Sequence, residues 1–441
     1  MSSSQTWPWL PPLPADRPLV RLGFISRLQT GLTVHGGRDL DGDVVTRPYL
    51  RVANVQAGWV SLDDITEIVV PREMANRSTL REGDVLMTEG GDLDKLGRGT
   101  VWRDEIRGCL HQNHVFAIRP DPSKLNADYL AWVTQSLHGR CYFESTGSRT
   151  TNLASTNSSK IAGFPIPLPN LDLQERIADF LDREIGAMNG LSLLRSSSER
   201  LLRERLTLLV DGAVVGDPDA LRELGIPYPA DIHHRVKLSR VCEITPGFSF
   251  PSAEFSLNPS DTRLLRGVNV GVGTIDWSES VFWPADQAKK FERFSLRQGD
   301  LIMGMDRPWI SEGLRLSIIQ DADLPALLLQ RVARLRPQRG LNADFLFWTL
   351  FASHLRKLVE AELTGVSVPH LSGEQIGSYR IWLPEMKVQR MIAESLREQA
   401  AALKDLRSTI DRQLMFLAER KQTLITAAVT GQIDATTARA V

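Results

Sequence analysis

The chain has little of what secreted, membrane-spanning or strongly basic proteins require. Its 441 residues include only three cysteines, Cys109, Cys141 and Cys242, and this odd number at wide spacing suits a reducing cytosol better than a disulfide framework. There is no run of eighteen apolar residues, and the start lacks the basic and apolar regions of a signal peptide, so we expect a cytoplasmic protein without a membrane span. A net charge of -1 also counts against binding nucleic acid through bulk charge alone.

Motifs for catalysis are missing as well. The segment GVGTID (271–276) comes nearest to a glycine-rich cofactor loop, but it lacks the third glycine and is better interpreted as a turn. The sequence has no Asn-Pro-Pro-aromatic motif of a methyltransferase and no Gly-Lys-Ser/Thr phosphate loop of an ATPase. We therefore expect a chain that is not an enzyme and binds no cofactor itself.

The dominant feature that is present is an internal repeat at a shift of 215 to 218 residues. The matched segments keep the same order from the start of the chain to its end. The pairs are Pro14-Ala15-Asp16 with Pro229-Ala230-Asp231, LRVANV (50–55) with LRGVNV (265–270), REGDVLM (81–87) with RQGDLIM (297–303), LNADYL (125–130) with LNADFL (341–346), Thr146-Gly147 with Thr364-Gly365, and AVVG (213–216) with AVTG (428–431). A shift held this long indicates one unit built twice, with loops that have diverged.

The repeat also argues against metal or nuclease sites. Cys109, His111 and His114 lie close together, but no second pair of ligands follows at zinc spacing, and the duplicate segment 327–331 keeps none of the three. The loop carboxylates form no repeated cluster either, and a solvated loop is the better interpretation of Glu89, Asp92 and Asp94. We expect no metal on this chain.

Each half begins with a globular mixture of strands and helices. Strand-like runs occur at 84–87, 100–102 and 115–118. Turns are predicted at Gly36-Gly37, Asp41-Gly42 and Gly90-Gly91. Apolar residues at helical spacing behind an Asp cap predict a helix over Asp128–Leu137, repeated over Asp344–Leu355.

Each half ends in a long helix. Residues 385–430 contain neither Gly nor Pro, and their apolar positions alternate in steps of four and three, which is typical of a coiled-coil seam. The seam residues are Ile392, Leu396, Gln399, Leu403, Leu406, Ile410, Gln413 and Leu417. A looser version runs over 170–215, interrupted by Gly186, Gly190 and a polar run. We expect the two helices to pack antiparallel within the molecule as a rod of roughly 60 Å, the alternative being a coiled coil that only dimerises the chain.

The junctions between these parts carry a resemblance. Each half closes with a proline-containing strand that runs into a helix opening with Gln and Ile-Ala, as in GFPIPLPNLDLQERIADFLDREI (163–185) and SYRIWLPEMKVQRMIAESLREQA (378–400). With the mid-domain strand GDVLM or GDLIM and the segment WLPPLPADRPLVRLG (9–23), this order closely resembles the DNA-specificity subunit of type I restriction-modification systems over essentially the whole chain. In that family two target-recognition domains each read half of a split DNA site, and two long helices act as spacer and docking surface.

The resemblance implies an α+β fold with two tandem, pseudo-symmetric mixed α/β target-recognition domains, separated by two long antiparallel helices that form a coiled coil. The implied boundaries are domain 1 at 1–168, the first spacer helix at 169–216, domain 2 at 217–384, the second spacer helix at 385–432 and a tail at 433–441.

The resemblance also implies partners. They are double-stranded DNA, two methyltransferase (modification) subunits and restriction/translocase subunits, with S-adenosylmethionine, ATP and Mg on those subunits and none on this chain. Partner contacts are expected where the helices begin, at Gln174, Ile177, Leu181, Gln389, Ile392 and Leu396. The second half departs from the family pattern, with Arg390 where the first half has Glu175. The alternative is a pseudo-symmetric protein-protein scaffold that does not read DNA.

Base-reading residues are expected where the repeat keeps its order but changes its contents, because two domains that read different sequences share a scaffold and differ in their contact loops. Three places qualify: the loop after the mid-domain strand, the segment before the late strand and the loop after Thr-Gly. In the first half they supply Thr88, Lys95, Arg98, Gln112, Asn113, His114, Ser148, Arg149, Thr150 and Asn152. In the second half they supply Arg307, Trp309, Gln330, Arg331, Ser367 and His370. The residues common to both copies are interpreted as phosphate contacts or structural hydrogen-bonders: Arg51, Asn54, Arg266 and Asn269.

Overall fold

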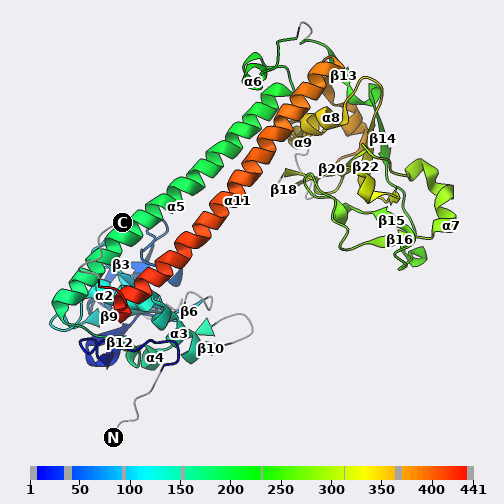
Figure 1. Cartoon of the computed structure of the whole chain (residues 1–441). Helices are drawn as coiled ribbons and strands as arrows, with labels where there is room; N and C mark the ends of the chain where they lie inside the picture. Colours follow the sequence, from blue (N-terminus) through cyan, green and yellow to red (C-terminus); the bar gives the residue numbers. More distant parts are fainter. Residues whose placement is uncertain are drawn as a thin grey trace. The chain divides into compact units, whose positions relative to one another are not determined.

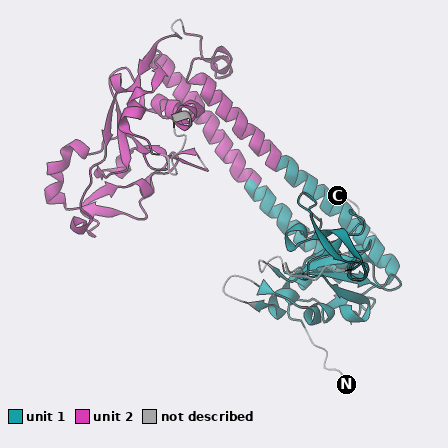
Figure 2. Ribbon diagram, turned by 180° about the vertical axis from the view of Figure 1, so that it is seen from behind, with its two compact units in different colours: residues 1–195, 411–441 teal, residues 196–410 magenta. Residues whose placement is uncertain are grey.

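The chain divides into two compact units, which Figure 2 colours separately. Unit 1 comprises residues 1–195 and 411–441, and unit 2 comprises residues 196–410. The computed structural model describes residues 7–33, 42–91, 96–149, 154–229, 232–311, 313–362 and 370–434. Each unit contains one globular α/β region and a part of both long helices.

Both units contain the same four-stranded antiparallel sheet (Figure 1). In unit 1 the strand order is β2 (Ser26–Thr30), β9 (Val115–Pro120), β5 (Val85–Thr88), β7 (Gly99–Val101). In unit 2 it is β14 (Cys242–Pro246), β22 (Val332–Pro337), β17 (Leu301–Gly304), β20 (Leu316–Ile318). The three strands predicted in the first half are confirmed as β5, β7 and β9.

Two further sheets are duplicated too. A three-stranded sheet, with one antiparallel and one parallel neighbour pair, has the order β4 (Thr66–Pro71), β3 (Val44–Leu50), β8 (Leu110–His111) in unit 1 and β16 (Val281–Trp283), β15 (Thr262–Leu265), β21 (Ala326–Leu328) in unit 2. A two-stranded sheet joins β1 (Leu19–Arg21) to β12 (Pro165–Pro167), and β13 (Arg235–Lys237) to β23 (Arg380–Trp382). Short helices complete each region, namely α1 (Arg72–Ser78) and α4 (Ser158–Ala162) in unit 1 and α6 (Pro218–Glu223), α7 (Ala285–Ala288) and α10 (Gly373–Ser378) in unit 2. The matching topology of these three sheets confirms the repeat that the sequence predicts.

The units differ in one small sheet. In unit 1, β10 (Ser148–Arg149), β11 (Ala154–Ser155) and β6 (Gly90–Gly91) form three short strands, whereas in unit 2 a two-stranded hairpin joins β18 (Trp309–Ile310) to β19 (Gly313–Leu314). The prediction of a turn at Gly90-Gly91 is therefore wrong. The two glycines pair with Ala154 and Ser155 of β11 in antiparallel register.

The region where each half was predicted to form one helix with an Asp cap contains two consecutive helices, and the first of them is capped by Asn. α2 (Ala127–Gln135) is followed by α3 (Leu137–Thr146), and the counterparts are α8 (Ala343–Phe351) and α9 (Ser353–Glu362). The caps are Asn126 and Asn342, whose side chains accept hydrogen bonds from the backbone N–H of Tyr129 and Phe345. Asp128 and Asp344 lie inside the first turn, where a negative charge favours the positive end of the helix dipole.

The two long helices are α5 (Leu171–Ala213) and α11 (Met386–Thr430), close to the predicted boundaries. In unit 1, Lys421 Nζ donates to Asn189 Oδ1 at 3.1 Å, and Arg195 donates to Gln413. The residue number falls along α11 as it rises along α5, so the predicted antiparallel packing is confirmed. No described helix is both long and apolar enough to cross a membrane.

The seam of α11 is less buried than its spacing suggests. Ile392 and Leu396 are fully buried, whereas Leu403 is half-buried and Gln399 and Leu406 are exposed. Ile392 and Leu396 belong to the core of unit 2, and Ile410 farther along α11 is also buried. Gln399, Leu403 and Leu406 line a groove together with Leu202, Leu206 and Leu209 of α5. Two helices alone cover one narrow stripe of each other, so flanking apolar side chains remain in solvent.

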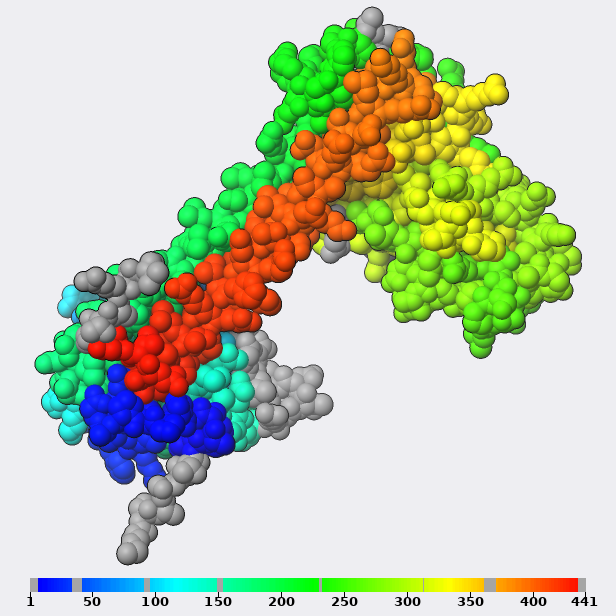
Figure 3. Space-filling view, viewed as in Figure 1, coloured from blue at the N-terminus to red at the C-terminus, as the bar shows by residue number. Residues whose placement is uncertain are grey.

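Each globular core is completed by the end of the long helix from the other half. In unit 1, Ile425, Ala428 and Val429 of α11 join the core around Phe143 and Phe164. Arg17 of the N-terminal segment donates from Nη1 to the carbonyls of Ala428 (2.5 Å) and Val429 (3.1 Å), and Figure 3 shows this blue segment against the red end of α11. In unit 2, the end of α5 enters the core in the same way at Leu209, Val210, Ala213 and Val214.

Candidate nucleic-acid interface

The three loops expected to carry base contacts meet in unit 1. The Glu89 N–H donates to the His114 carbonyl at 2.8 Å, which joins the loop after β5 to the turn before β9. The Thr156 N–H donates to the Glu89 carbonyl at 2.7 Å, and β10 and β11 pair beside β6. We call this meeting of residues 88–91, 112–114, 148–149 and 154–156 the loop junction of unit 1.

Unit 2 repeats the junction with different residues. The Met305 N–H donates to the Arg331 carbonyl at 3.0 Å, and the Leu371 N–H donates to the Met305 carbonyl at 2.9 Å. These bonds occupy the places of the two bonds around Glu89 in unit 1. The loop junction of unit 2 consists of residues 304–307, 329–331 and 370–371.

A glycine in each unit makes the close approach behind the junction possible. A Cβ on Gly31 would lie 2.2 Å from the Gln112 carbonyl oxygen, and a Cβ on Gly247 would lie 1.8 Å from the Leu329 carbonyl oxygen. No side chain fits at either distance. The strand that precedes each glycine therefore brings the turn before the late strand to the same place in both units.

An acidic side chain holds basic partners at each junction. Glu89 Oε2 lies 2.5 Å from His114 Nδ1 in unit 1. In unit 2, Asp306 Oδ2 accepts from Arg331 Nη1 at 3.0 Å, and Asp306 Oδ1 lies 2.6 Å from His370 Nδ1. His114 and Arg331 occupy equivalent positions before the late strand. The expectation that Glu89 is merely solvated is wrong, because its side chain is one-third exposed and paired.

Backbone strain concentrates at the junction of unit 2. Among the described non-glycine residues, three have a positive φ: Asp104 (58°), Arg307 (46°) and Arg331 (69°). Two of them are residues expected to contact bases. Such conformations cost free energy and persist where the surrounding structure holds a side chain in a required direction, which favours a functional role for Arg307 and Arg331.

The other expected residues that lie at the junctions are polar and at least partly accessible. Thr88 ends β5, and Gln112 Oε1 accepts from the Val52 N–H at 3.3 Å. Asn113 is half-exposed in the turn before β9, and Ser148 Oγ accepts from Lys160 Nζ at 3.0 Å. In unit 2, Gln330 and His370 are exposed.

Two expected residues lie elsewhere. Arg98 and Trp309 line clefts between the globular region and the long helices, Arg98 in unit 1 and Trp309 in unit 2. Arg149 belongs to β10, but its side chain is outside the described part of the structure. Four further candidates also lie outside the described residues: Lys95, Thr150, Asn152 and Ser367.

The residues shared by both repeats are structural. The Asn54 side chain accepts from the Arg51 N–H at 2.8 Å and donates to the carbonyls of Ser61 and Asp64. In unit 2 the Asn269 side chain accepts from the Arg266 N–H at 2.9 Å and donates to the Asp276 carbonyl. Of the two roles open to them from the sequence, the structure supports that of hydrogen-bonders which fix the loop after β3 and β15.

Cys109 and His111 belong to the interior. Burial raises the pKa of the Cys109 thiol to about 12 and lowers the pKa of the His111 imidazole. His111 Nδ1 lies 2.7 Å from the Val115 carbonyl oxygen, while His114 is exposed at the loop junction. The described residues contain no group of three or more His, Cys, Asp or Glu that could hold a metal ion. The segment 271–276 is a turn, closed by a hydrogen bond from the Gly271 N–H to the Thr274 carbonyl at 2.9 Å.

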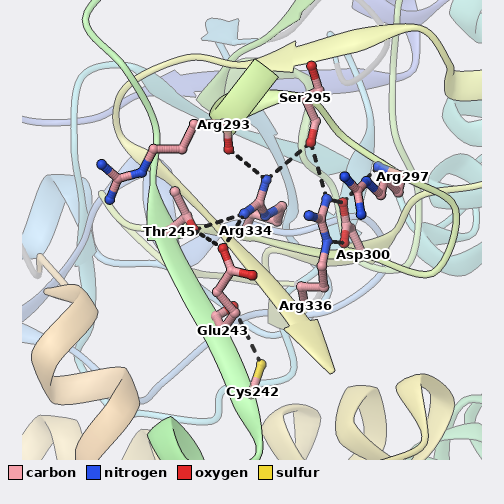
Figure 4. Close-up of polar contacts among 9 residues, drawn as sticks. All are labelled: Cys242, Glu243, Thr245, Arg293, Ser295, Arg297, Asp300, Arg334 and Arg336. Atoms are coloured by element: carbon pink, nitrogen blue, oxygen red, sulfur yellow. Dashed lines mark hydrogen bonds and ion pairs between the residues drawn. The ribbon is translucent and has the colours of Figure 1, made fainter. Parts of the chain in front are cut away.

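Unit 2 contains a buried arginine with several polar contacts (Figure 4). Arg334 of β22 is 1% exposed and donates to the carbonyls of Arg293 (3.0 Å) and Ser295 (3.1 Å) and to Glu243 Oε1 (2.7 Å). Ala117 occupies its place in unit 1. The neighbouring ion pair is shared, since Arg336 binds Asp300 as Arg119 binds Asp84.

The six residues expected to contact partner subunits are fully buried in this chain, which corrects their expected role. Gln174, Ile177, Leu181, Gln389, Ile392 and Leu396 are each 0% exposed. Side chains with no accessible surface cannot supply contacts to another subunit. The helical spacing of these residues reflects packing in the hydrophobic core, because the start of each long helix packs against the globular region of its own unit.

Gln174 and Gln389 instead anchor the long helices. Gln174 Oε1 accepts from the Asn126 N–H at 2.9 Å, and its Nε2 donates to the carbonyls of Lys124 and Pro169. Gln389 makes the equivalent bonds to the Asn342 N–H (2.8 Å) and to the carbonyls of Gly340 and Pro384. An amide that satisfies one donor and two acceptors in the interior explains why Gln recurs in both repeats.

Accessible apolar residues lie elsewhere on the helices, at positions of which the sequence pattern identified only Leu406, as a residue of the coiled-coil seam. Leu191 and Leu406 are equivalent in the repeat and are 40% and 41% exposed. Leu201 and Phe416 are also equivalent and are 57% and 59% exposed. Leu191 and Phe416 belong to unit 1 and Leu201 and Leu406 to unit 2, so each unit has the same two apolar positions, one from each helix.

The sequence and the fold of this chain were compared with those of known proteins. No family model matches the chain. The MjaVIII type I restriction enzyme specificity subunit of Methanocaldococcus jannaschii is 28% identical over 261 residues. The match covers 58% of this chain and 60% of that relative, so it spans less than two thirds of the relative's length.

Two solved structures share the fold across nearly the whole chain. One, from work on complex assembly and conformational transition of a type I R-M system, has a TM-score of 0.73 at 18% identity and covers 96% of this chain and 100% of its own. The other, an HsdS subunit from Thermoanaerobacter tengcongensis, has a TM-score of 0.57 at 18% identity and covers 96% and 98%. In sequence the chain is thus a relative of type I restriction enzyme specificity subunits, and it has the fold of an HsdS subunit.

Proposed function

We propose that the chain is a non-catalytic, sequence-specific DNA-recognition subunit of a type I restriction-modification complex. The observation that carries the proposal is the pair of loop junctions. Both have the same backbone hydrogen bonds around the residue after β5 or β17, and they present different side chains. Two readers of different half-sequences need a common scaffold with exchanged contacts.

The residue types at the junctions suit direct base readout. Gln and Asn can bond adenine bidentately, Arg suits guanine, and a carboxylate can accept from the cytosine amino group. Unit 1 offers Gln112, Asn113 and Glu89, and unit 2 offers Arg307, Arg331 and Asp306. Each unit would read one half of a bipartite DNA site.

Partner subunits would supply what this chain lacks. A net charge of -1 gives weak attraction to DNA phosphates, so we expect other subunits to contribute much of the phosphate contact. We propose that two methyltransferase subunits dock on the long helices at the equivalent positions Leu191 with Phe416 and Leu201 with Leu406. S-adenosylmethionine, ATP and Mg would be bound by methyltransferase and restriction subunits.

Domain exchange tests independent reading. Replacing residues 1–168 with the corresponding part of a relative of different specificity should change one half of the methylated site and leave the other half intact. Methylome sequencing of cells that carry the chimera and the modification subunit gives the result. A change in both halves would contradict the proposal, and loss of all methylation from a chimera that folds and assembles would do so as well.

Subunit stoichiometry tests the docking positions. The double variant Leu191→Ser, Phe416→Ser should bind one methyltransferase subunit in place of two, and Leu201→Ser, Leu406→Ser should lose the other. Native mass spectrometry of the purified complexes counts the subunits. Leu208→Ser is the matched control, because Leu208 is 72% exposed on α5 but Thr423 stands at the equivalent position of α11. Two subunits on both double variants would show that docking occurs elsewhere.

Matched insertions test the helices as the spacer of the DNA site. Four residues inserted after Ser192 in α5 and four after Leu417 in α11 lie between the bonds Asn189–Lys421 and Arg195–Gln413, so both helices lengthen together. The added length is about 6 Å, or one to two base pairs at ~3.4 Å each. We expect the methylated site to gain that spacing with both half-sequences unchanged. An unchanged spacer would exclude the helices as the ruler.

A DNA-binding experiment distinguishes this proposal from the alternative, a protein scaffold that does not read DNA. The complex of this chain with its methyltransferase subunit should retain DNA in a sequence-selective and salt-dependent way. A complex that assembles but shows no sequence preference at any salt concentration would favour the scaffold.

A further inference from the structure

We infer that unit 2 contains an open pocket for a ligand that carries both a carboxylate and a cationic group, as the amino acid arginine does. The pocket has a volume of about 440 Å³ and lies between α8, the loop after β20 and α11. A volume of this size is typical of small-ligand sites. The lining residues with ionisable side chains are Asp323, Asp344 and Arg397, and the aromatic ones are Phe347 and Trp348.

In unit 1 the corresponding groups are satisfied by the chain's own side chains. The Trp132 indole donates from Nε1 to Asp182 Oδ1 of α5 at 2.8 Å. Arg103, in the loop after β7, donates to both carboxylate oxygens of Asp128 in α2. Burial raises the pKa of Asp182, and the hydrogen bond from Trp132 and the charge of Arg103 both oppose that rise. A carboxylate and a guanidinium therefore lie close together at this place in the fold.

Unit 2 keeps the groups that receive this pair and lacks the pair itself. The equivalent positions are Asp128 and Asp344, Trp132 and Trp348, Arg103 and Gln320, and Asp182 and Arg397. Asp344 and Arg397 have no ion-pair partner among the described residues. Trp348 is 8% exposed, and its indole N–H donates to no described residue. A largely buried donor without an acceptor costs free energy, so an acceptor that enters the pocket stabilises unit 2.

A ligand with both charges would restore the contacts that unit 1 makes internally. Its cationic group would pair with Asp344, and its carboxylate would accept from Trp348 Nε1 and Arg397. Asp344 and Trp348 are four residues apart in α8, so they lie on one face with Cβ atoms roughly 6 Å apart. The apolar stem between the two charges would pack on the Phe347 ring, as the stems of basic side chains do.

The charges of the lining favour such a ligand over a simple anion or cation. Two carboxylates, Asp323 and Asp344, face one guanidinium, Arg397. Asp323 already accepts from the Trp277 indole and from the Gln320 N–H, both at 2.8 Å. The carboxylates would repel an anion without a cationic group, and a cation alone would leave the buried indole donor without an acceptor. A group of each sign satisfies both sides of the pocket.

Fluorine NMR of the full chain labelled with 5-fluorotryptophan tests the pocket directly. Trp348→Phe identifies the Trp348 signal, and titration with L-arginine should shift that signal to saturation. Asp344→Asn and Arg397→Gln should each weaken binding about tenfold, because each removes one charge-assisted contact. Asp128→Asn, the matched change in unit 1, should leave binding unaltered. An equal loss in Asp128→Asn overturns the assignment to unit 2.

A variant that fills the pocket guards against misfolding as an explanation. Gln320→Arg combined with Arg397→Asp gives unit 2 the side chains of unit 1, so it should remain folded by circular dichroism and lose arginine binding. Binding that survives in this double variant overturns the inference. Agmatine keeps the guanidinium of arginine without the carboxylate, and it should bind about tenfold more weakly. Equal binding of agmatine and L-arginine would contradict the role of Trp348 Nε1 and Arg397.

Two probes distinguish the sources of the ligand. A capped helical peptide with Glu and Arg four residues apart carries the same two charges on side chains. Tighter binding of this peptide than of L-arginine would assign the pocket to a segment of a partner protein, and the reverse order would assign it to a free amino acid. If neither probe shifts the Trp348 signal to saturation, the inference is overturned.

Discussion

Unit 1 and unit 2 share the hydrogen bonds that fix their backbones, but they differ in the side chains that this backbone carries. The equivalent residues Gln174 and Gln389 make the same three hydrogen bonds at the start of the long helices, and Asp84 and Asp300 pair with equivalent arginines. The polar contacts of the late strand are not repeated in this way. Unit 2 buries Arg334 there, whereas unit 1 has Ala117 with His111 close to Gln29.

The difference shows which contacts a repeat must keep. Backbone hydrogen bonds and the anchoring amides fix where the loops meet, so they recur in both units. In a buried polar cluster every donor and acceptor needs a hydrogen-bond partner, but the residues that supply the partners can differ between the two units. The exposed side chains of the junctions are then free to differ, as two readers of different sequences require.

The largest expected effect comes from breaking the cluster that only unit 2 has. Arg334→Ala leaves the Arg293 carbonyl without its Arg334 donor and the Ser295 carbonyl with Arg336 alone, and we expect unit 2 to lose about 3 kcal/mol of stability. Hydrogen-deuterium exchange should show faster exchange in β14, β17 and β22, with unit 1 unaffected. Protection unchanged in those strands would mean that the cluster contributes little.

The reverse substitution sharpens the comparison. Ala117→Arg would bury a guanidinium in unit 1, where Arg27 stands at the position of Glu243 and offers no carboxylate. We expect a somewhat smaller loss of stability than that of Arg334→Ala, confined to unit 1. Equal stability of wild type and Ala117→Arg would show that the interior of unit 1 can rearrange.

The shared anchors should respond equally. Gln174→Ala removes the acceptor of the buried Asn126 N–H, and Gln389→Ala does the same for Asn342, so each should destabilise its unit by roughly 2 kcal/mol. Denaturant unfolding, with exchange to locate the change, measures both. A loss in one variant only would show that the two helix starts are not equivalent in energy, despite their equal geometry.

A smaller effect is expected at the loop junctions. Asp306→Asn removes the charge that holds Arg331 and His370, whereas Glu89→Gln releases only His114. We expect Asp306→Asn to raise the affinity of the assembled complex for unrelated DNA by roughly fivefold, about 1 kcal/mol, and Glu89→Gln to raise it less at pH 8. Competition binding against random-sequence DNA measures the change. A lower affinity for unrelated DNA in Asp306→Asn would contradict a restraining role for the carboxylate.

The smallest effect compares the two long helices. α5 contains Gly186 and Gly190, and a Cβ at either would meet nothing within 4 Å, whereas α11 has no glycine. Gly186→Ala and Gly190→Ala should each stabilise unit 1 by about 0.5–1 kcal/mol, because alanine loses less conformational freedom in a helix. Thermal unfolding followed by circular dichroism should show additive increases. A decrease in stability would indicate that these glycines adopt a second conformation that function requires.

Sequence patterns were accurate where one local signal determined the outcome. The absence of Gly and Pro over 385–430 predicted α11 almost to its ends, and the constant shift of the repeat predicted two units that share their three main sheets. The same patterns failed where a buried core position and a partner-binding position produce the same spacing in the sequence. Ile177 and Leu181 recur at helical spacing whether they face a core or a partner, and only their burial shows that they face the core.

The sequence by itself determined the duplication, the long helices and the loops that would carry contacts, because these depend on order and periodicity along the chain. The tertiary structure alone decided which of those loops meet, and which side chains face solvent. Arg98 and Glu89 come from one loop, yet Glu89 pairs with His114 at the junction while Arg98 faces Lys421 in a cleft. The partners of both residues come from distant parts of the chain, and the distance between them is fixed by packing that no local pattern encodes.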